Sequence, residues 1–304
     1  MVDVLLKSFS FILLIAIGYF WRSRKVFGDR DYQVLTRVVM NITLPAAIIT
    51  GFAGLTVSAA LLLVMLLGLL CNIALLALGW FVTRGKPNAH RAFVMMNYAG
   101  YNIGAFAIPF LQVFLGPVGV VTACMFDAGN AMLCTGGSYA ITSAITSPDG
   151  EKFRLRPLFK KLFSSVTFDV YLVVMLAALL GVTTPDWLLR LLAPASAANA
   201  GVAMLMIGLM FRWSPKPGYL RAAVGTVAIR TLFGAAVAVL VCLFAPFSNE
   251  GKQVVSILLF APISIISTAY TEQCGGDAGL AGFTNSLSIV VSIVIITSIV
   301  LVMS

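Results

Sequence analysis

The stretch Asn97–Gly116 places polar and helix-breaking residues inside an apolar run long enough to cross a bilayer. Its sequence is NYAGYNIGAFAIPFLQVFLG. Because proline removes an amide donor and glycine unwinds readily, carbonyls near Ile103–Ala107 are expected to lack helical partners. Such groups are tolerated at membrane depth only when buried in protein or lining a wet cavity. The stretch predicts a substrate or ion site with Asn102, Gly104 and Pro109 as contacts; the alternative is a packed proline kink.

A second interrupted stretch, FAPISIISTAYTEQCGG, contains Pro262 and Ser264. Asn130 follows Pro109 after 21 positions, and Asn285 follows Pro262 after 23 positions. Paired interruptions at corresponding places in two halves of a chain are typical of the binding site of a secondary transporter. Pro262 and Ser264 are therefore predicted substrate contacts as well.

Two charged residues lie deep within predicted spans. Asp127 and Asn130 are three positions apart, so they share one helical face, and with Asn285 they are candidates for binding a coupling ion. Arg230 lies ten residues beyond Leu220, about 15 Å into a core of ~30 Å. Either Arg230 and Asp127 neutralise each other as a structural pair, or Arg230 grips a substrate carboxylate while Asp127 serves a cation or proton.

Asn41 is a further candidate contact, because it lies one turn before Pro45 and can satisfy a carbonyl that the proline frees. The kink there is either structural or part of the substrate site. Enzymatic chemistry is not expected. The chain has one histidine, His90, and its five cysteines lack metal-ligand spacing, so neither a nucleophile with its base nor a metal site is predicted.

Composition identifies an integral membrane protein. Of the 304 residues, 60% are hydrophobic and 10% are charged, and the mean hydropathy is +1.02. The net charge of +9 does not indicate nucleic acid, because the basic residues occupy short loops between apolar runs.

Windows of ~20 residues predict about ten spans. They cover residues 4–21, 34–52, 57–82, 92–115, 117–142, 164–182, 188–211, 219–246, 251–271 and 279–303. Sixteen of the twenty Lys and Arg residues fall in four loops on one side of this arrangement. By the positive-inside rule that side is cytoplasmic, so we expect a multi-pass protein of the inner (cytoplasmic) membrane with both termini outside.

The polar connection 147–161 is predicted to be a cytoplasmic linker between residues 1–146 and 162–304. Each of these halves has five spans. Because an odd number of spans inverts the second half, the fold class expected is an all-α membrane protein made of two inverted five-helix repeats.

Several motifs occur in one order along the chain. They are Asn41-x-x-Leu-Pro45, Asn102-x-Gly104 with Pro109, Gly116-Pro117, and the pair Asp127 and Asn130. Together they resemble the auxin efflux carrier family, in particular its short bacterial members. The resemblance implies a scaffold domain of spans 1, 2, 6 and 7 and a transport domain of spans 3–5 and 8–10. It also implies two broken helices that cross at their prolines, in a fold shared with bile acid/sodium symporters.

Members of this family handle organic anions such as auxin or malonate. By this resemblance, Asn102 and Pro109 would lie at the first crossover and Pro262 at the second, where a substrate carboxylate would meet the half-helix ends. The connection 147–161 is too short to be the regulatory loop of plant members, so auxin itself is not the expected substrate.

The predicted function is a secondary transporter, or permease, that moves a small organic anion of the carboxylate class by alternating access. A channel or ligand sensor with the same broken-helix site is the alternative, and counterflow in proteoliposomes separates the two. The lipid bilayer is the expected environment, and no cofactor, metal or nucleic acid is expected. Coupling to sodium or protons and a homodimer through the scaffold domain are left open.

Overall fold

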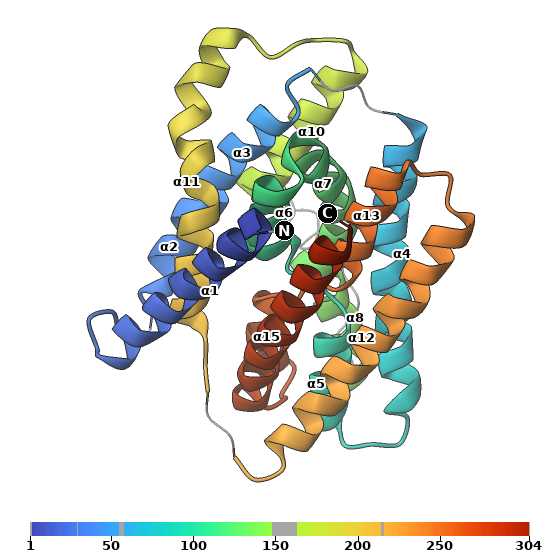
Figure 1. Cartoon of the computed structure of the whole chain (residues 1–304). Helices are drawn as coiled ribbons and strands as arrows, with labels where there is room; N and C mark the ends of the chain where they lie inside the picture. Colours follow the sequence, from blue (N-terminus) through green and yellow to red (C-terminus); the bar gives the residue numbers. More distant parts are fainter. Residues whose placement is uncertain (1, 29, 55–57, 148–162, 214–215, 304) are drawn as a thin grey trace.

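The computed structural model describes residues 2–28, 30–54, 58–147, 163–213 and 216–303 (Figure 1). Every regular element within these ranges is helical, and an isolated antiparallel bridge joins Tyr101 to Ile263. The predicted all-helical, multi-pass class is confirmed. Apart from Ser147, the predicted linker 147–161 lies outside the described residues.

The helices are long where the apolar sequence is uninterrupted and divided where it is not. In chain order they are α1 (Val2–Ser23), α2 (Tyr32–Val38), η1 (Val39–Thr43), α3 (Leu44–Gly51), α4 (Ala59–Val82), α5 (Asn88–Tyr98), η2 (Ile103–Ala107), α6 (Ile108–Phe114), α7 (Gly116–Met132), η3 (Leu133–Gly137), α8 (Ser138–Thr146), α10 (Val166–Leu179), α11 (Asp186–Met210), α12 (Tyr219–Phe244), α13 (Asn249–Leu259), α14 (Ile266–Gln273) and α15 (Ala278–Met303). The three η elements are single π-helical turns.

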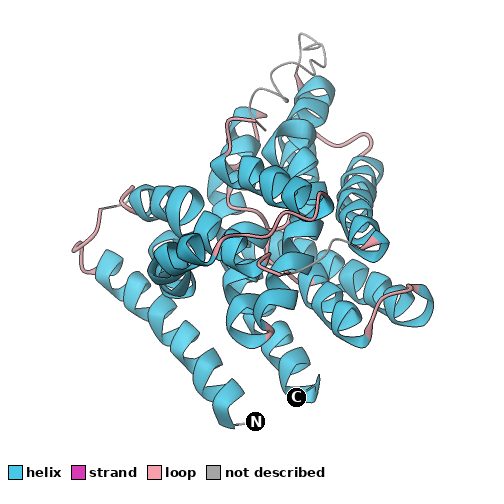
Figure 2. Ribbon diagram, turned by 90° about the horizontal axis from the view of Figure 1, so that it is seen from above, coloured by secondary structure: helices cyan, strands magenta, loops and turns pink. Residues whose placement is uncertain are grey.

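Each predicted span coincides with one helix or with a run of consecutive helices. In the described ranges, seven helical stretches are long and apolar enough to cross a membrane, and Ile103–Phe114 and Val166–Leu179 are shorter apolar helices. The start of α1 and the end of α15 lie near each other in both views (Figures 1 and 2). The division into two repeats and two domains stays a prediction.

Glycines allow two pairs of helices to pack at very short range. α1 packs along α11, where a Cβ atom on Gly18 would lie only 3.1 Å from the Cα atom of Gly208. α4 packs along α7, where a Cβ atom on Gly68 would lie 3.3 Å from the Cα atom of Phe126. Small residues at such contacts let helix backbones approach closely, which favours van der Waals packing between helices in lipid.

Two predicted spans are interrupted in their middle. The fourth span is split between α5 and η2 by residues 99–102, and the ninth is split between α13 and α14 by residues 260–265. The first interruption lies earlier than the sequence predicted. Residues Ile103–Ala107 form the π-helical turn η2, and Pro109 is in the first turn of α6, where its missing N–H costs little. The chain breaks instead at Gly100, whose φ of +84° belongs to the left-handed region that favours glycine.

Candidate functional site

The two interruptions meet and satisfy each other's backbone. The amide of Asn102 donates to the carbonyl of Pro262 at 2.9 Å, and the amide of Ser264 donates to the carbonyl of Gly100 at 3.2 Å. These bonds flank the bridge between Tyr101 and Ile263. Two non-helical segments far apart in sequence therefore form one short antiparallel contact, which answers the requirement for backbone pairing at membrane depth.

Two asparagine side chains hold the first interruption. Asn130 of α7 accepts a bond from the amide of Tyr101 and donates to the carbonyl of the same residue, each at 3.0 Å. Asn72 of α4 accepts from the amide of Gly100 at 2.7 Å and donates to the carbonyl of Gly68 and to the Asn130 side chain. The carboxamides thus replace the helical bonds that the interruption removes.

Side chains of α15 bind the backbone of the second interruption. Asn285 donates to the carbonyls of Ile263 at 2.9 Å and Ser264 at 3.2 Å, and the Ser288 hydroxyl accepts from the amide of Ile263. Asn130 and Asn285 therefore act on Tyr101 and Ile263, the two residues that form the bridge. Both side chains bind main chain in this structure, and Asn130 also donates to the Asp127 carboxylate, so their role toward a coupling ion stays a prediction.

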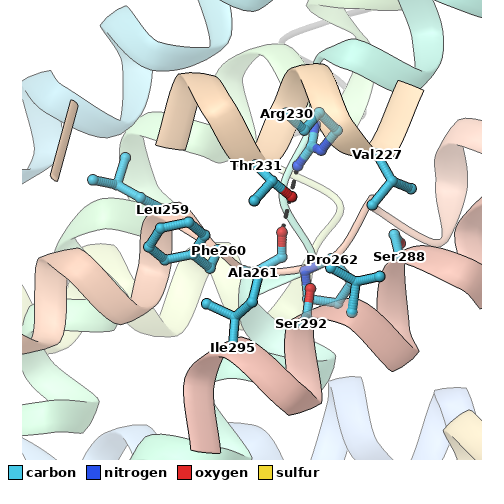
Figure 3. Close-up of a pocket in the computed structure, with 11 residues that line it drawn as sticks. Val227, Arg230, Thr231, Leu259, Phe260, Ala261, Pro262, Ser288, Ser292 and Ile295 are labelled. Carbon is cyan, nitrogen blue, oxygen red and sulfur yellow. Dashed lines mark hydrogen bonds between the residues drawn. The ribbon is translucent and has the colours of Figure 1, made fainter. Parts of the chain in front are cut away.

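Arg230 of α12 lies next to this contact, and its side chain is buried, with 7% of the residue exposed. Its guanidinium donates to the carbonyl of Tyr98, at the end of α5. It also donates to the carbonyl of Ala261 at 3.5 Å, just beyond α13 (Figure 3). The guanidinium carbon also lies 4.7 Å from the centre of the Tyr101 ring. Helix C-termini carry partial negative charge, so one cation stabilises the ends of both half-helices.

A small cavity of about 20 Å³ adjoins Arg230 and is lined by Thr231, Pro262, Ser288 and Ser292, among others (Figure 3). A cavity needs about 10–15 Å³ to hold one water molecule, so this one has room for a single water and not for an organic carboxylate. In this structure the Arg230 guanidinium binds main-chain carbonyls, and its contact with a substrate stays a prediction.

Among the described residues, the hydrogen-bond partners of Asp127, in α7, are Asn130 and Tyr171 and do not include Arg230. Its carboxylate accepts a bond from the Asn130 side chain at 2.8 Å and one from the hydroxyl of Tyr171 of α10 at 2.9 Å. In the described part of the chain, the predicted ion pair between Arg230 and Asp127 is not formed. The two charges are satisfied separately because main-chain carbonyls and neutral hydrogen-bond donors take the place of the opposite charge.

Three polar atoms beside the meeting point are buried and have no hydrogen-bond partner among the residues described. They are the Asn102 side-chain nitrogen, the Tyr101 hydroxyl oxygen and the Asn97 side-chain oxygen. Asn97 uses its nitrogen to donate to the carbonyl of Phe93 and to the Thr271 hydroxyl. Buried polar atoms without partners are rare in folded proteins and cost about 1–3 kcal/mol each, so they indicate where a ligand or water binds.

A larger cavity of about 320 Å³ leads toward the second interruption. Its lining includes Tyr32, Arg212, Thr268, Glu272 and Gly282. It also includes Asn285, which binds the second interruption. Tyr32 begins α2 and Arg212 follows α11, so the cavity opens among segments on the side of the basic loops. Its volume suits a small organic molecule.

The remaining predicted contacts lie in different surroundings. Asn41 is exposed on η1 and donates to the carbonyl of Arg37 at 2.9 Å, rather than to a carbonyl freed by Pro45. A Cβ atom on Gly104 would lie 3.5 Å from the Asp127 carboxylate, so this glycine leaves room for the acid. The Ser264 hydroxyl accepts a bond from the Cys134 thiol at 3.0 Å.

The sequence analysis missed Asn72, Tyr171 and Ser288. Asn72 had a usable signal, because it is a lone carboxamide in the otherwise apolar stretch that forms α4. Tyr171 and Ser288 had none, since hydroxyl residues are common in membrane helices and their partners come from other helices. In the described ranges, no group of three or more His, Cys, Asp and Glu residues is placed to hold a metal ion.

Comparison with known proteins places this geometry in context. Residues 4–151 match the family model described as membrane transport protein. A stretch of 155 residues is 26% identical to an uncharacterized transporter of Methanothermobacter thermautotrophicus, and the alignment covers 49% of this chain and 51% of that protein. The chain thus spans about half the length of this curated relative. The resemblance to the auxin efflux carrier family is confirmed over the half that matches.

Proposed function

From the match of residues 4–151 to membrane transport proteins, we propose that this chain is a secondary transporter of a small organic anion. The observation that carries the proposal is the contact between two interrupted spans, with unpartnered polar atoms buried beside it in the described structure. Interrupted spans that meet near mid-membrane are a recurring design of transporter binding sites.

Two of the three unpartnered atoms favour an anionic ligand. The Asn102 amide and the Tyr101 hydroxyl are both able to donate, so each suits an oxygen of an anion. Arg230 adds positive charge, because its guanidinium lies 4.7 Å from the Tyr101 ring centre and is bound to neutral carbonyls. Its contribution is to the electrostatic potential at the site, without direct contact to the substrate.

The transport cycle we propose is alternating access across the cytoplasmic membrane. The cavity lined by Arg212 and Asn285 would be the route from the cytoplasmic side, and it would close as the predicted transport domain moves against the scaffold domain. Asp127 is the residue we assign to a coupling sodium ion or proton. Its bond to Tyr171 joins α7 to α10, which the family resemblance assigns to different domains.

Thermal unfolding of the purified protein with a panel of carboxylates, with and without sodium and at two pH values, tests the substrate class. We expect at least one small mono- or dicarboxylate to raise the melting temperature, and neutral analogues of equal size to have no effect. Stabilisation by amines or neutral solutes instead would contradict the anion assignment. Counterflow with the stabilising compound would then separate a carrier from a channel or sensor.

A further inference from the structure

A second cavity, of about 610 Å³, lies at the ends of α1 and α11, away from the interrupted spans. Basic residues and aromatic residues dominate its lining. They are Arg22, Lys25 and Arg212, and Tyr19, Phe27, Phe211 and Trp213, with Ser23 and Gly28 completing the set. We refer to it as the basic cavity.

Among the described residues that line the basic cavity, three are basic and none is acidic. Arg22 is fixed in place, because its guanidinium donates to the carbonyls of Leu209 at 3.3 Å and Phe211 at 3.0 Å. Arg212 is fixed by its backbone, whose amide donates to the Ser286 hydroxyl of α15 at 2.8 Å. The concentration of positive charge is thus built into the ends of packed helices and favours an anionic group.

Aromatic rings pack against one another in the lining of the same cavity. Phe211 and Trp213 stack with ring centres 6.5 Å apart and planes 4° apart, and Tyr19 meets Phe211 edge to face at 5.6 Å. Trp213 is 54% exposed and Tyr19 is 42% exposed. Exposed Trp and Tyr at the ends of apolar helices are typical of the headgroup level of a membrane.

The position of the basic cavity along α1 and α11 also agrees with the headgroup level of a membrane. The apolar stretch of α1 ends at Ser23 and that of α11 ends at Met210. The cavity is lined by the last turns of α1 and by residues that follow both helices. Only 17% of the apolar stretch of α1 is buried within the protein, so most of its length is available to lipid chains. A ligand with a phosphate in the cavity could therefore lay its acyl chains along α1.

We propose that the basic cavity binds the phosphate headgroup of an anionic phospholipid in the leaflet on the side of the basic loops. The phosphate would accept bonds from Lys25 and Arg212, and Arg22 would add charge at the end of α11. Because Arg212 is bound to Ser286, an occupied cavity would also join α1 and α11 to α15. Arg212 also lines the cavity proposed as the cytoplasmic route, but Arg22 and Lys25 do not, and no residue of the interruptions takes part in binding the phosphate. The assignment therefore does not depend on the proposed function.

Quenching of Trp213 fluorescence tests the proposal. A protein that keeps Trp213 and carries Trp21→Phe, Trp80→Phe and Trp187→Phe is reconstituted in nanodiscs of phosphatidylcholine with a fixed fraction of brominated phosphatidylglycerol or brominated phosphatidylcholine. We expect stronger quenching by the brominated phosphatidylglycerol. Each removed charge should weaken its apparent affinity about fivefold, since a basic residue near an anionic surface contributes ~1 kcal/mol.

The test variant is Lys25→Gln with Arg212→Gln, which leaves Arg22 and its bonds to α11 intact. Its matched control is Arg84→Gln with Arg221→Gln, which removes two basic residues on the same predicted side but outside the cavity. The excess quenching should disappear in the test variant and persist in the control. Equal quenching by both lipids, or equal loss in both variants, would overturn the proposal. Displacement of the lipid by inorganic phosphate alone would overturn the assignment to a phospholipid.

Discussion

At the scale of single residues, the environment of Arg230 explains how a cation is stable deep in a membrane protein without a carboxylate partner. Its donors meet the carbonyls of Tyr98 and Ala261, which are the groups left unpaired where two half-helices end. A cation is favourable at a helix C-terminus, and hydrogen bonds from a charged group contribute about 1.5–3 kcal/mol each. The arginine and the interruptions therefore stabilise each other.

This environment predicts that Arg230 and Asp127 act independently. Arg230→Gln should lower the free energy of unfolding by roughly 1.5–3 kcal/mol, because the bonds to Tyr98 and Ala261 lose their charge. Asp127→Asn should have its own smaller effect through Asn130 and Tyr171. In detergent unfolding experiments, the two effects should add within about 0.5 kcal/mol. Recovery of stability in the double variant would instead reveal an ion pair.

A second prediction compares two asparagines beside the same interruption. Asn102→Ala should leave the melting temperature almost unchanged and should abolish stabilisation by the carboxylate substrate, because the Asn102 nitrogen is buried without a partner in the described structure. Asn72→Ala is the matched control. It should lower stability by about 1–3 kcal/mol, because the amide of Gly100 then loses its acceptor.

Melting curves of both variants, with and without the stabilising carboxylate, provide the measurement. A large loss of stability in Asn102→Ala with unchanged ligand response would show that Asn102 is a packing residue and would refute its role as a contact.

At the scale of elements, the sequence allowed the spans to be predicted well and the interruption in the fourth span poorly. Span positions follow from apolar length and loop charge, which depend on local composition alone. The interruption depends on tertiary structure, because Gly100 in its left-handed conformation requires partners from α4, α7 and the other interrupted span. Pro109, the stronger local signal, fits into the first turn of α6, so proline was a misleading marker there and a correct one at Pro262.

The bonding partners within the site were beyond sequence reasoning for a similar reason. The same-face spacing of Asp127 and Asn130 indicated their mutual bond, and the structure contains it. Which helix end Arg230 would meet depends on how α12 packs against α5 and α13, and no local pattern encodes that packing.

A matched pair of substitutions tests where the fourth span is broken. Gly100→Ala should cost at least about 1–2 kcal/mol, because an L-residue is strained at a φ of +84° and its Cβ atom would lie 3.3 Å from the Cβ atom of Ser264. Pro109→Ala should change the free energy of unfolding by less than about 1 kcal/mol. Thermal unfolding in one detergent compares the two, and the reverse order of effects would place the structural break at the proline.

At the scale of the whole molecule, positive charge is concentrated in two regions. One is the meeting point of the interrupted spans near Arg230, and the other is the basic cavity at the ends of α1 and α11. The charge asymmetry of the loops predicts that the basic cavity lies on the cytoplasmic side. The same asymmetry predicts that both termini are outside and that residues 147–161 are inside.

Single cysteines in a variant without the five native cysteines test this topology. Ser147→Cys should react with a membrane-impermeant maleimide only from the cytoplasmic side, and Ser248→Cys, at the start of α13, only from the outside. Labelling of intact cells and of inverted vesicles provides the comparison. Reaction of both positions from one side would contradict the inverted arrangement of the two halves.

The most direct test of the central claim is counterflow in proteoliposomes with the carboxylate that stabilises the protein. Unlabelled substrate inside should drive transient accumulation of labelled substrate from outside for the unmodified protein and for Arg84→Gln. Asn102→Ala, folded and with an unchanged melting temperature, should show none. Downhill leakage without exchange in the unmodified protein, or full exchange by Asn102→Ala, would contradict the claim that this chain is a carrier whose substrate binds where the two interrupted spans meet.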